Sequence, residues 1–355
     1  MRSVCWAGLP DKHYGLMKFL CRLLLAGMAV SAGCMMPDQQ AFAQPDPDFH
    51  IFLCFGQSNM VGQAPIEACD MTVSDRFLMM SPVGCDQHPK HEWSVAVPPL
   101  CRCDTKLGPV DYFGRTLLEY LPENVRVGVI VVAVDGTAID LFHPNKYKAY
   151  VRKVYETQSL NYQANQINAY DDRNPLQALL TCAKLAQQDG VIKGVIMHQG
   201  ETGAHDDDYY WRKSVKEVYQ NILKELNLSA DSVPFFAGEA VRGDVRNPGQ
   251  CANANTSIGK LPKVITSPCY VISSEGCSWA SDRLHFDAAG YRELGKRYAE
   301  TYLSEYLGLD LTGVERHETD PLPQNESEIY GINGYRLETL QPGVNLINGK
   351  KYLVK

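Results

Sequence analysis

The chain has 355 residues, of which 45% are hydrophobic, and a formal net charge of −7. This apolar content excludes an intrinsically disordered chain, because it is enough to build a packed core. The length allows one large domain or two ordinary ones. The mild acidity argues against nucleic acid or an anionic lipid surface as the main partner, since both attract basic proteins.

The N-terminal segment resembles a secretory signal. Lys18 and Arg22 form a basic start, and the apolar run over residues 23–36 is short for a bilayer span. Ala41-Phe42-Ala43 then gives the small-x-small pattern of a cleavage site. We therefore predict a signal peptide over residues 1–43, no transmembrane segment, and export to the periplasm, the cell surface or the medium.

Two alternatives remain open at this end. Met17 is an alternative start, because residues 1–16 add nothing to the signal. Cys34 follows a Ser-Ala-Gly sequence similar to a lipobox, so a lipoprotein anchored through Cys34 ranks second to cleavage after Ala43.

Cysteine use follows from the predicted compartment. The chain has 12 cysteines, and cleavage would leave an odd number of them in an oxidising environment. We expect most to be paired and at least one to be free. Cys54 and Cys182 are the candidates for free thiols, because they lie in predicted core elements.

Short apolar runs alternate with helical patterns from about residue 49 onward. Continuous Val, Ile and Phe runs are typical of central parallel strands that are covered on both faces. Such strands are predicted at residues 50–55, 126–134, 191–198, 233–238 and 264–273, and amphipathic helices at 208–226 and 287–307. This alternation predicts a three-layer α/β/α fold with a mostly parallel sheet over residues 44–310.

Three regions depart from this rhythm. Residues 67–107 are loop-like and contain Cys69, Cys85, Cys101 and Cys103, whose spacing lacks the paired CxxC of a zinc ribbon. Disulfides are therefore favoured over a metal site there. Residues 311–328 are predicted as a linker, and residues 329–355 as a small β tail, because Asn-Gly turn signals punctuate that tail.

The first candidate for chemistry is Ser58, in Gly56-Gln57-Ser58-Asn59-Met60 directly after the first predicted strand. Ligands of open α/β sheets bind at the carboxyl ends of strands, so Ser58 is well placed as a nucleophile. The alternative is an ordinary strand-to-helix turn in which Ser58 caps the helix.

The second candidate is a pair, Asp282 and His285, just before the last predicted helix. A neutral histidine can accept a hydroxyl proton when a carboxylate orients its ring. The alternative interpretation is an Asp–His pair near a helix start that has only a structural role.

Two further strand ends carry polar groups. His198-Gln199-Gly200-Glu201 follows one strand, and Asp135-Gly136-Thr137 follows another. The Gln199 amide and the Gly136 N–H could donate to an oxyanion. Glu201 could instead cap the next helix, and Gly136 could be a plain turn glycine. Together the four strand ends hold every part that acyl transfer requires, and none of these parts is a metal or cofactor.

At this point the sequence resembles a known family. IFLCFGQSNMVGQ, VAVDGTAI, GVIMHQGE and DRLHFDAAGYRELGKRYA are similar to successive blocks of the sialate O-acetylesterase-like branch of the SGNH hydrolases, which includes the acetylxylan esterases of carbohydrate esterase family six. The resemblance implies a flavodoxin-like fold and an exported serine esterase that removes O-acetyl groups from carbohydrates of the acetylated xylan or sialic acid type.

The resemblance also implies roles. Ser58 is the nucleophile and His285 the base, with Asp282 orienting it and Glu201 as the alternative acid. Ser58 N–H, Gly136 N–H and the Gln199 side chain form the oxyanion hole. Other small acyl esters as substrates, or a non-catalytic surface glycan-binding protein, are the alternative functions. Residues 329–355 resemble C-terminal tails recognised by secretion machinery of type nine.

Overall fold

A computed structural model describes residues 44–311, 329–331, 335–339 and 341, and the backbone of two strands at 343–347 and 350–354. The predicted signal peptide and the predicted linker beyond residue 311 lie outside the described residues.

The core of the molecule is a seven-stranded sheet with the order β3-β2-β4-β1-β5-β6-β7. Every neighbouring pair is parallel except β2 and β3, which are antiparallel. The segment β4-β1-β5-β6-β7 has the flavodoxin-like order. The strands are β1 (Asp46–Gly56), β2 (Phe77–Met80), β3 (Trp93–Val95), β4 (Arg126–Ala133), β5 (Gly190–His198), β6 (Phe235–Gly238) and β7 (Cys269–Ile272).

Strand β1 shows why the sheet needs cover on both faces. Its side chains alternate between two apolar cores, because successive residues of a strand point to opposite faces. Leu53 and Phe55 belong to one core, and Phe52 and Cys54 to the other. The Phe52 ring packs edge-on against Phe113 with ring centroids 4.8 Å apart.

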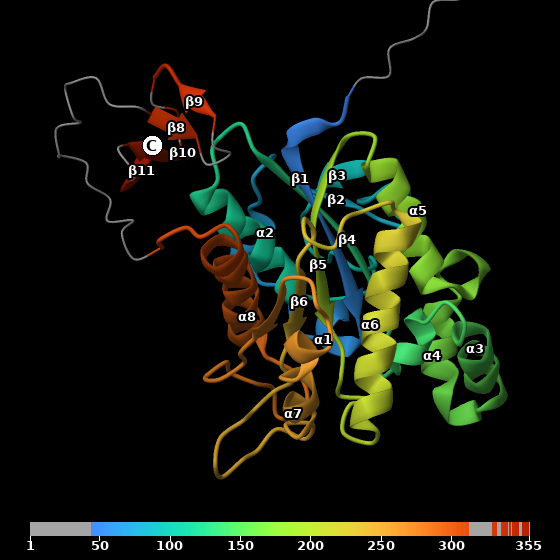
Figure 1. Cartoon of the computed structure of the whole chain (residues 1–355). Helices are drawn as coiled ribbons and strands as arrows, with labels where there is room; N and C mark the ends of the chain where they lie inside the picture. The colour runs from blue at the N-terminus through green and yellow to red at the C-terminus, as the bar shows by residue number, and fades with distance from the viewer. Residues whose placement is uncertain are drawn as a thin grey trace, which may run out of the picture. The chain divides into compact units, whose positions relative to one another are not determined.

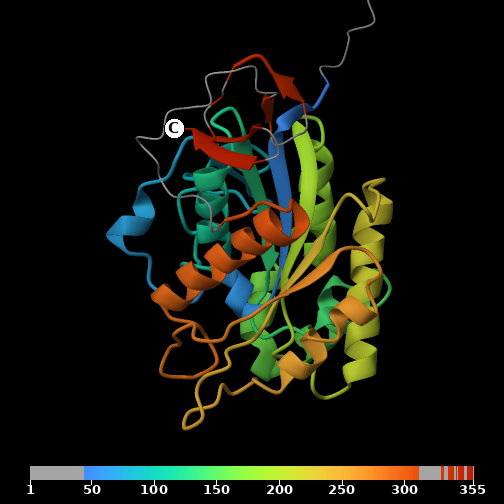
Figure 2. The ribbon, with the colours of Figure 1, turned by 60° about the vertical axis from the view of Figure 1, so that its left-hand side comes forward.

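Helices complete the two outer layers (Figures 1 and 2). One face of the sheet is covered by α2 (Pro109–Tyr120) and α8 (Ala288–Thr301), and the other by α5 (Pro175–Ala186) and α6 (Asp208–Glu225). The shorter helices are α1 (Ser58–Val61), α3 (Tyr147–Glu156), α4 (Asn161–Ile167) and α7 (Ala254–Ile258). Single turns are η1 (Ala68–Met71), η2 (Ile139–Phe142), η3 (Gln158–Leu160), η4 (Asp171–Arg173), η5 (Leu261–Lys263) and η6 (Tyr302–Tyr306).

The α/β/α fold and mostly parallel sheet predicted from the sequence are confirmed. Each predicted strand is present, although the last is shorter than predicted: β7 covers only Cys269–Ile272 of the predicted 264–273. The helix predicted over 287–307 is α8 followed by the π-helical turn η6. The apolar stripes of both helices are buried, including Trp211 and Tyr298 at 1% exposure each.

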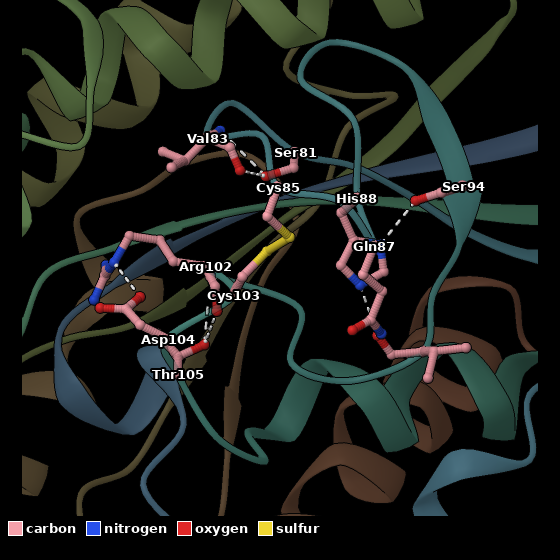
Figure 3. The surroundings of a disulfide bond; sticks show 11 residues. Ser81, Val83, Cys85, Gln87, His88, Ser94, Arg102, Cys103, Asp104 and Thr105 are labelled. Carbon is pink, nitrogen blue, oxygen red and sulfur yellow. Dashed lines mark hydrogen bonds and ion pairs between the residues drawn. A yellow bond between two sulfur atoms is a disulfide. The ribbon is translucent and has the colours of Figure 1, made fainter.

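The segment predicted as loop-like differs from expectation. Residues 67–107 contain η1, β2 and β3; β2 pairs with β4, and β3 forms the edge of the central sheet. Both strands are short runs inside a segment that is mostly turns and bends, so the segment as a whole has no strand or helix pattern in the sequence. His88 in this segment is 1% exposed and bonds Ser94 Oγ and Val97 O through its two ring nitrogens (Figure 3).

A disulfide joins Cys85 to Cys103 within this segment (Figure 3). The expectation that most cysteines are paired is wrong for the described residues. The remaining described cysteines are free thiols: Cys54, Cys69, Cys101, Cys182, Cys251, Cys269 and Cys277. Cys54 and Cys182 are free and buried, as predicted.

Four short strands near the C-terminus form a separate antiparallel sheet with the order β11-β10-β8-β9. They are β8 (Ile329–Gly331), β9 (Arg336–Leu337), β10 (Gly343–Ile347) and β11 (Lys350–Val354). Within the described residues, no helix is both long and apolar enough to cross a membrane.

Candidate active site

Three of the predicted site residues follow adjacent strands, at the carboxyl ends of these strands. Strand β1 lies between β4 and β5, and Ser58, Gly136 and Gln199 follow these three strands. The chain reverses its direction of strand addition here, and such a switch point is where open α/β sheets bind ligands. Figure 1 shows α1, which begins at Ser58, at this end of the strands.

The turn that carries Ser58 is held on both sides. Val134 N donates to Gly56 O at 3.2 Å, and Gln57 N donates to His198 O at 3.0 Å. Position 56 must be a glycine, because a Cβ there would lie 2.0 Å from His198 O. The neighbouring strands therefore fix the position of Ser58, whose side chain is 6% exposed.

Ser58, His285 and Asp282 form a continuous hydrogen-bonded chain. His285 Nε2 lies 2.9 Å from Ser58 Oγ, and His285 Nδ1 lies 2.7 Å from Asp282 Oδ2. The carboxylate accepts from Nδ1–H, which leaves Nε2 as the acceptor for the serine proton. This is the geometry of an activated nucleophile, a base and an orienting acid.

The loop before α8 carries both Asp282 and His285. Asp282 Oδ1 accepts from the backbone N–H groups of Leu284 and His285 at 2.9 and 3.0 Å. Burial alone would raise the pKa of Asp282, but these two N–H groups and the His285 ring hold it below its usual value. Asp282 therefore stays charged. Arg283, which lies between Asp282 and His285 in the chain, has a backbone φ of +55°, a conformation that few non-glycine residues adopt.

Asn59 connects the turn that carries Ser58 to the loop that carries His285. Its Nδ2 donates to Leu284 O at 3.1 Å, and its Oδ1 accepts from Phe286 N at 3.4 Å. The side chain thus bonds the residues on both sides of His285. Asn59 is fully buried and Nδ2 also donates to Glu201 Oε1 at 2.6 Å. These bonds fix the position of the His285 backbone relative to the turn that carries Ser58.

Glu201 lies in a buried polar cluster rather than beside His285. Besides Asn59, its neighbour is His198, whose Nε2 is 3.6 Å from Glu201 Oε1. Burial lowers the pKa of His198, although the Glu201 carboxylate opposes the shift. Glu201 Oε2 and His198 Nε2 have no hydrogen-bond partner within the described part of the chain. The structure thus places Asp282, not Glu201, against the ring of His285.

Helix α4 holds the loop that contains Gly136. Gln166 accepts from Asp135 N at 2.9 Å and donates to Asp135 Oδ2 at 2.7 Å. Gln163 Nε2 donates to Gly136 O at 2.9 Å. Gly136 has φ +64°, which favours glycine. Neither Gly136 N–H nor Ser58 N–H has an acceptor among the described residues, so both amides can donate to a bound oxyanion.

Gln199 is placed differently from the predicted oxyanion donor. Its Nε2 donates to Gln57 Oε1, Thr137 O and Thr202 O at 3.0–3.2 Å. Its Oε1 accepts from Trp211 Nε1 at 2.6 Å. An amide has two N–H groups, so this buried side chain has no hydrogen left for a substrate in this arrangement. It joins three strand ends, and its role as an oxyanion donor stays a prediction.

Sequence reasoning missed the supporting residues. Asn59 is part of the motif that points to Ser58, yet its bonds to Leu284 and Phe286 lie across more than 200 positions of the chain. Gln163 and Gln166 lie in a helix without any motif. The only sequence signal was their spacing of three, which puts both amides on one face of a helix.

Comparisons with known proteins identify the family of this chain. Residues 48–304 match the family described as carbohydrate esterase, sialic acid-specific acetylesterase. The chain belongs to this family. As a member it is a carboxylic ester hydrolase, and the sialate O-acetylesterase family assignment made from the motifs is confirmed.

Solved structures support the fold of this acetylesterase family member. A protein from Arabidopsis thaliana has 19% sequence identity and a TM-score of 0.55, and the match covers 74% of this chain and 100% of that one. NanS has 15% identity and a TM-score of 0.54, with 75% and 99% of the two chains covered. At such identities the likeness concerns the fold.

Proposed function

We propose that this enzyme releases acetate from O-acetylated carbohydrates of the xylan or sialic acid type through an acetyl-enzyme on Ser58. The observation that carries the proposal is the continuous contact from Ser58 Oγ through His285 to Asp282 at 2.9 and 2.7 Å. Membership of an acetylesterase family supports the acetyl group as the acyl part.

The first half-reaction forms the acetyl-enzyme. Ser58 Oγ attacks the acetyl carbonyl carbon while His285 Nε2 takes the hydroxyl proton. The carbonyl oxygen becomes an oxyanion that faces the N–H groups of Ser58 and Gly136, each worth roughly 3–4 kcal/mol in the transition state. His285 then gives its proton to the departing sugar oxygen, and the bond from that oxygen to the acetyl carbon breaks.

The second half-reaction frees the enzyme. His285 takes a proton from a water molecule, which attacks the acetyl carbon on Ser58. Collapse of the second oxyanion breaks the ester bond to Ser58 Oγ, and His285 returns the proton to that oxygen. Asp282 stays charged throughout and stabilises the protonated ring.

An acetate-release screen tests the substrate. It compares acetylated xylo-oligosaccharides, O-acetylated sialic acid, and p-nitrophenyl acetate, butyrate and octanoate. We expect kcat/KM to be highest for an acetylated sugar and to fall with acyl length. A maximum at butyrate or octanoate would overturn the carbohydrate proposal in favour of an esterase for other small acyl esters.

Ser58→Ala is the matched control for the same screen. Loss of the nucleophile should lower turnover by on the order of 10⁴-fold or more, because the other triad members act through it. The circular dichroism spectrum should stay unchanged, since Ser58 Oγ bonds only His285 among the described residues. A variant that keeps its activity would refute the covalent mechanism.

We also propose that the enzyme is exported. The N-terminal signal pattern and the disulfide between Cys85 and Cys103 support this, because structural disulfides are characteristic of oxidising compartments. Mass spectrometry of the mature chain should find Gln44 at its N-terminus. A diacylated Cys34 would instead make the enzyme a lipoprotein.

The C-terminal residues are proposed to act in secretion. Removal of residues 325–355 should block release of the enzyme from the producing cell and leave kcat on acetylated sugars unchanged. Unchanged release together with a less stable enzyme would rule out the secretion role.

A further inference from the structure

An exposed tyrosine lies directly against the predicted oxyanion loop. Tyr162, in α4, has 47% of its surface exposed, although its neighbour Gln163 is only 2% exposed. A Cβ built on Gly136 would come within 2.5 Å of the Tyr162 hydroxyl oxygen and 3.5 Å of the ring carbon Cζ. The phenol therefore lies beside the residue whose N–H faces the reacting carbonyl.

The position of the Tyr162 hydroxyl is fixed by the same side chain that fixes Gly136. Gln163 Nε2 donates to Tyr162 Oη at 3.0 Å and to Gly136 O at 2.9 Å. The phenol oxygen thus accepts one hydrogen bond, while its own hydrogen has no acceptor among the described residues. That hydrogen remains able to bind an oxygen of a ligand at this edge of the sheet.

The connection that contains Tyr162 has more helices than the fold requires. The connection from β4 to β5 needs one crossover helix, and α5 supplies it by covering the sheet. Before α5 the chain forms α3 and α4, which Figure 1 shows at the same end of the molecule as α1. Extra structure at the carboxyl ends of strands is where α/β enzymes recognise their substrates.

We propose that Tyr162 is a specificity-determining residue that contacts the sugar bearing the acetyl group. Its exposed ring faces the apolar C–H side of the pyranose, and its hydroxyl donates to a sugar oxygen next to the ester. Sugar sites combine such aromatic area with a few fixed polar groups. This inference rests on the proposed function, because it assigns the sugar side of the same site.

The test measures kcat and KM of Tyr162→Ala and Tyr162→Phe on acetylated xylo-oligosaccharides, on O-acetylated sialic acid and on ethyl acetate. Ethyl acetate carries the acetyl group without a ring. For the better sugar ester we expect Tyr162→Ala to lower kcat/KM by at least tenfold more than for ethyl acetate, mainly through KM. Tyr162→Phe keeps the ring and should show a smaller, intermediate loss.

Tyr120→Ala is the control, because α2 ends at Tyr120 and then leads to the opposite, amino end of β4. Equal losses of Tyr162→Ala on sugar and ethyl esters would overturn the proposal, since Tyr162 would then act on the oxyanion loop alone. Losses within twofold on every ester would overturn it as well. An active Ser58→Ala variant would instead refute the proposed function, which separates the two failures.

Discussion

The two sides of the active site are built in different ways. On the proton-transfer side, Ser58, His285 and Asp282 contact each other directly, and all three lie in recognisable motifs. On the oxyanion side, Gly136 is held by Gln163, a residue of a helix that no motif marks. The comparison teaches that a motif marks the groups proposed to react, whereas the groups that hold a backbone amide in place lie here in a helix that no motif marks.

The first prediction tests the proton-transfer side and has the largest expected effect. Asp282→Asn should lower kcat on an acetylated sugar by on the order of 10³- to 10⁴-fold, because the amide no longer favours the ring tautomer that accepts from Ser58. Glu201→Gln should cost far less, about tenfold, since the amide oxygen can still accept from Asn59.

Steady-state kinetics of the two variants side by side decide between the two acids. The far-ultraviolet spectrum and the unfolding temperature check that both proteins are folded. A larger loss for Glu201→Gln than for Asp282→Asn would show that Asp282 is not the orienting acid.

The second prediction concerns the segment that supports the end of β4. Arg102, beside the disulfide, is 4% exposed and donates to Ala133 O at 2.7 Å, just before the oxyanion loop. Replacing both Cys85 and Cys103 with serine should lower the free energy of unfolding by about 3 kcal/mol, because the bond closes a loop of 18 residues.

Denaturant unfolding at equilibrium measures this loss. Cys69→Ser, which removes an exposed free thiol, is the matched control and should change stability by less than about 0.5 kcal/mol. Reducing agent should destabilise the natural protein and leave the double variant unaffected. Coincident unfolding curves for the double variant and the natural protein would contradict the prediction.

The third prediction tests the oxyanion side directly. Gln163→Met keeps the size of the side chain but removes the donor to Gly136 O, so the Gly136 amide is less well oriented. We expect kcat to fall by about 10- to 30-fold, less than loss of a whole oxyanion donor, because Thr202 Oγ1 also bonds Gly136 O at 3.3 Å.

Gln177→Met is the control for this variant, because Gln177 is an exposed glutamine in α5. The kinetics should show the loss in kcat on sugar and ethyl esters alike, since both form the same oxyanion. A kcat within twofold of the natural enzyme would mean that α4 does not support the oxyanion.

The difference between residues that lie in motifs and residues that do not explains how much of the fold and the site could be predicted from the sequence. Continuous apolar runs such as 126–134 predict buried parallel strands, and the order of motifs places Ser58 and His285 at one edge of the sheet. Strands β2 and β3 were missed because they are runs of four and three residues inside a segment that otherwise consists mostly of turns and bends. The contacts of Asn59 and the bonds of Gln199 to Gln57 and Thr137 were also missed, since pairings across more than 60 positions leave no local pattern.

The last prediction separates stability from catalysis with a residue at the far end of β1. His50 lies six residues before Gly56, about 20 Å along the strand from the site. Burial, assisted by the positive charge of Lys193, lowers the pKa of His50 to about 4. Between pH 4 and 6.5 the folded protein therefore binds less proton at His50 than the unfolded chain does.

Stability must then fall as the pH decreases through this range, because the unfolded state takes up the extra proton. The single site should cost about 1.2 kcal/mol of unfolding free energy between pH 7 and pH 5.5. His50→Phe cannot titrate, so its stability should decline less steeply, although His88 and His198, whose pKa values burial also lowers, keep some of the slope. Equal slopes for the two proteins would contradict the assignment. The pH dependence of kcat should stay the same in both, since His50 is remote from Ser58, and any acid loss of kcat then belongs to the proton-transfer side of the site.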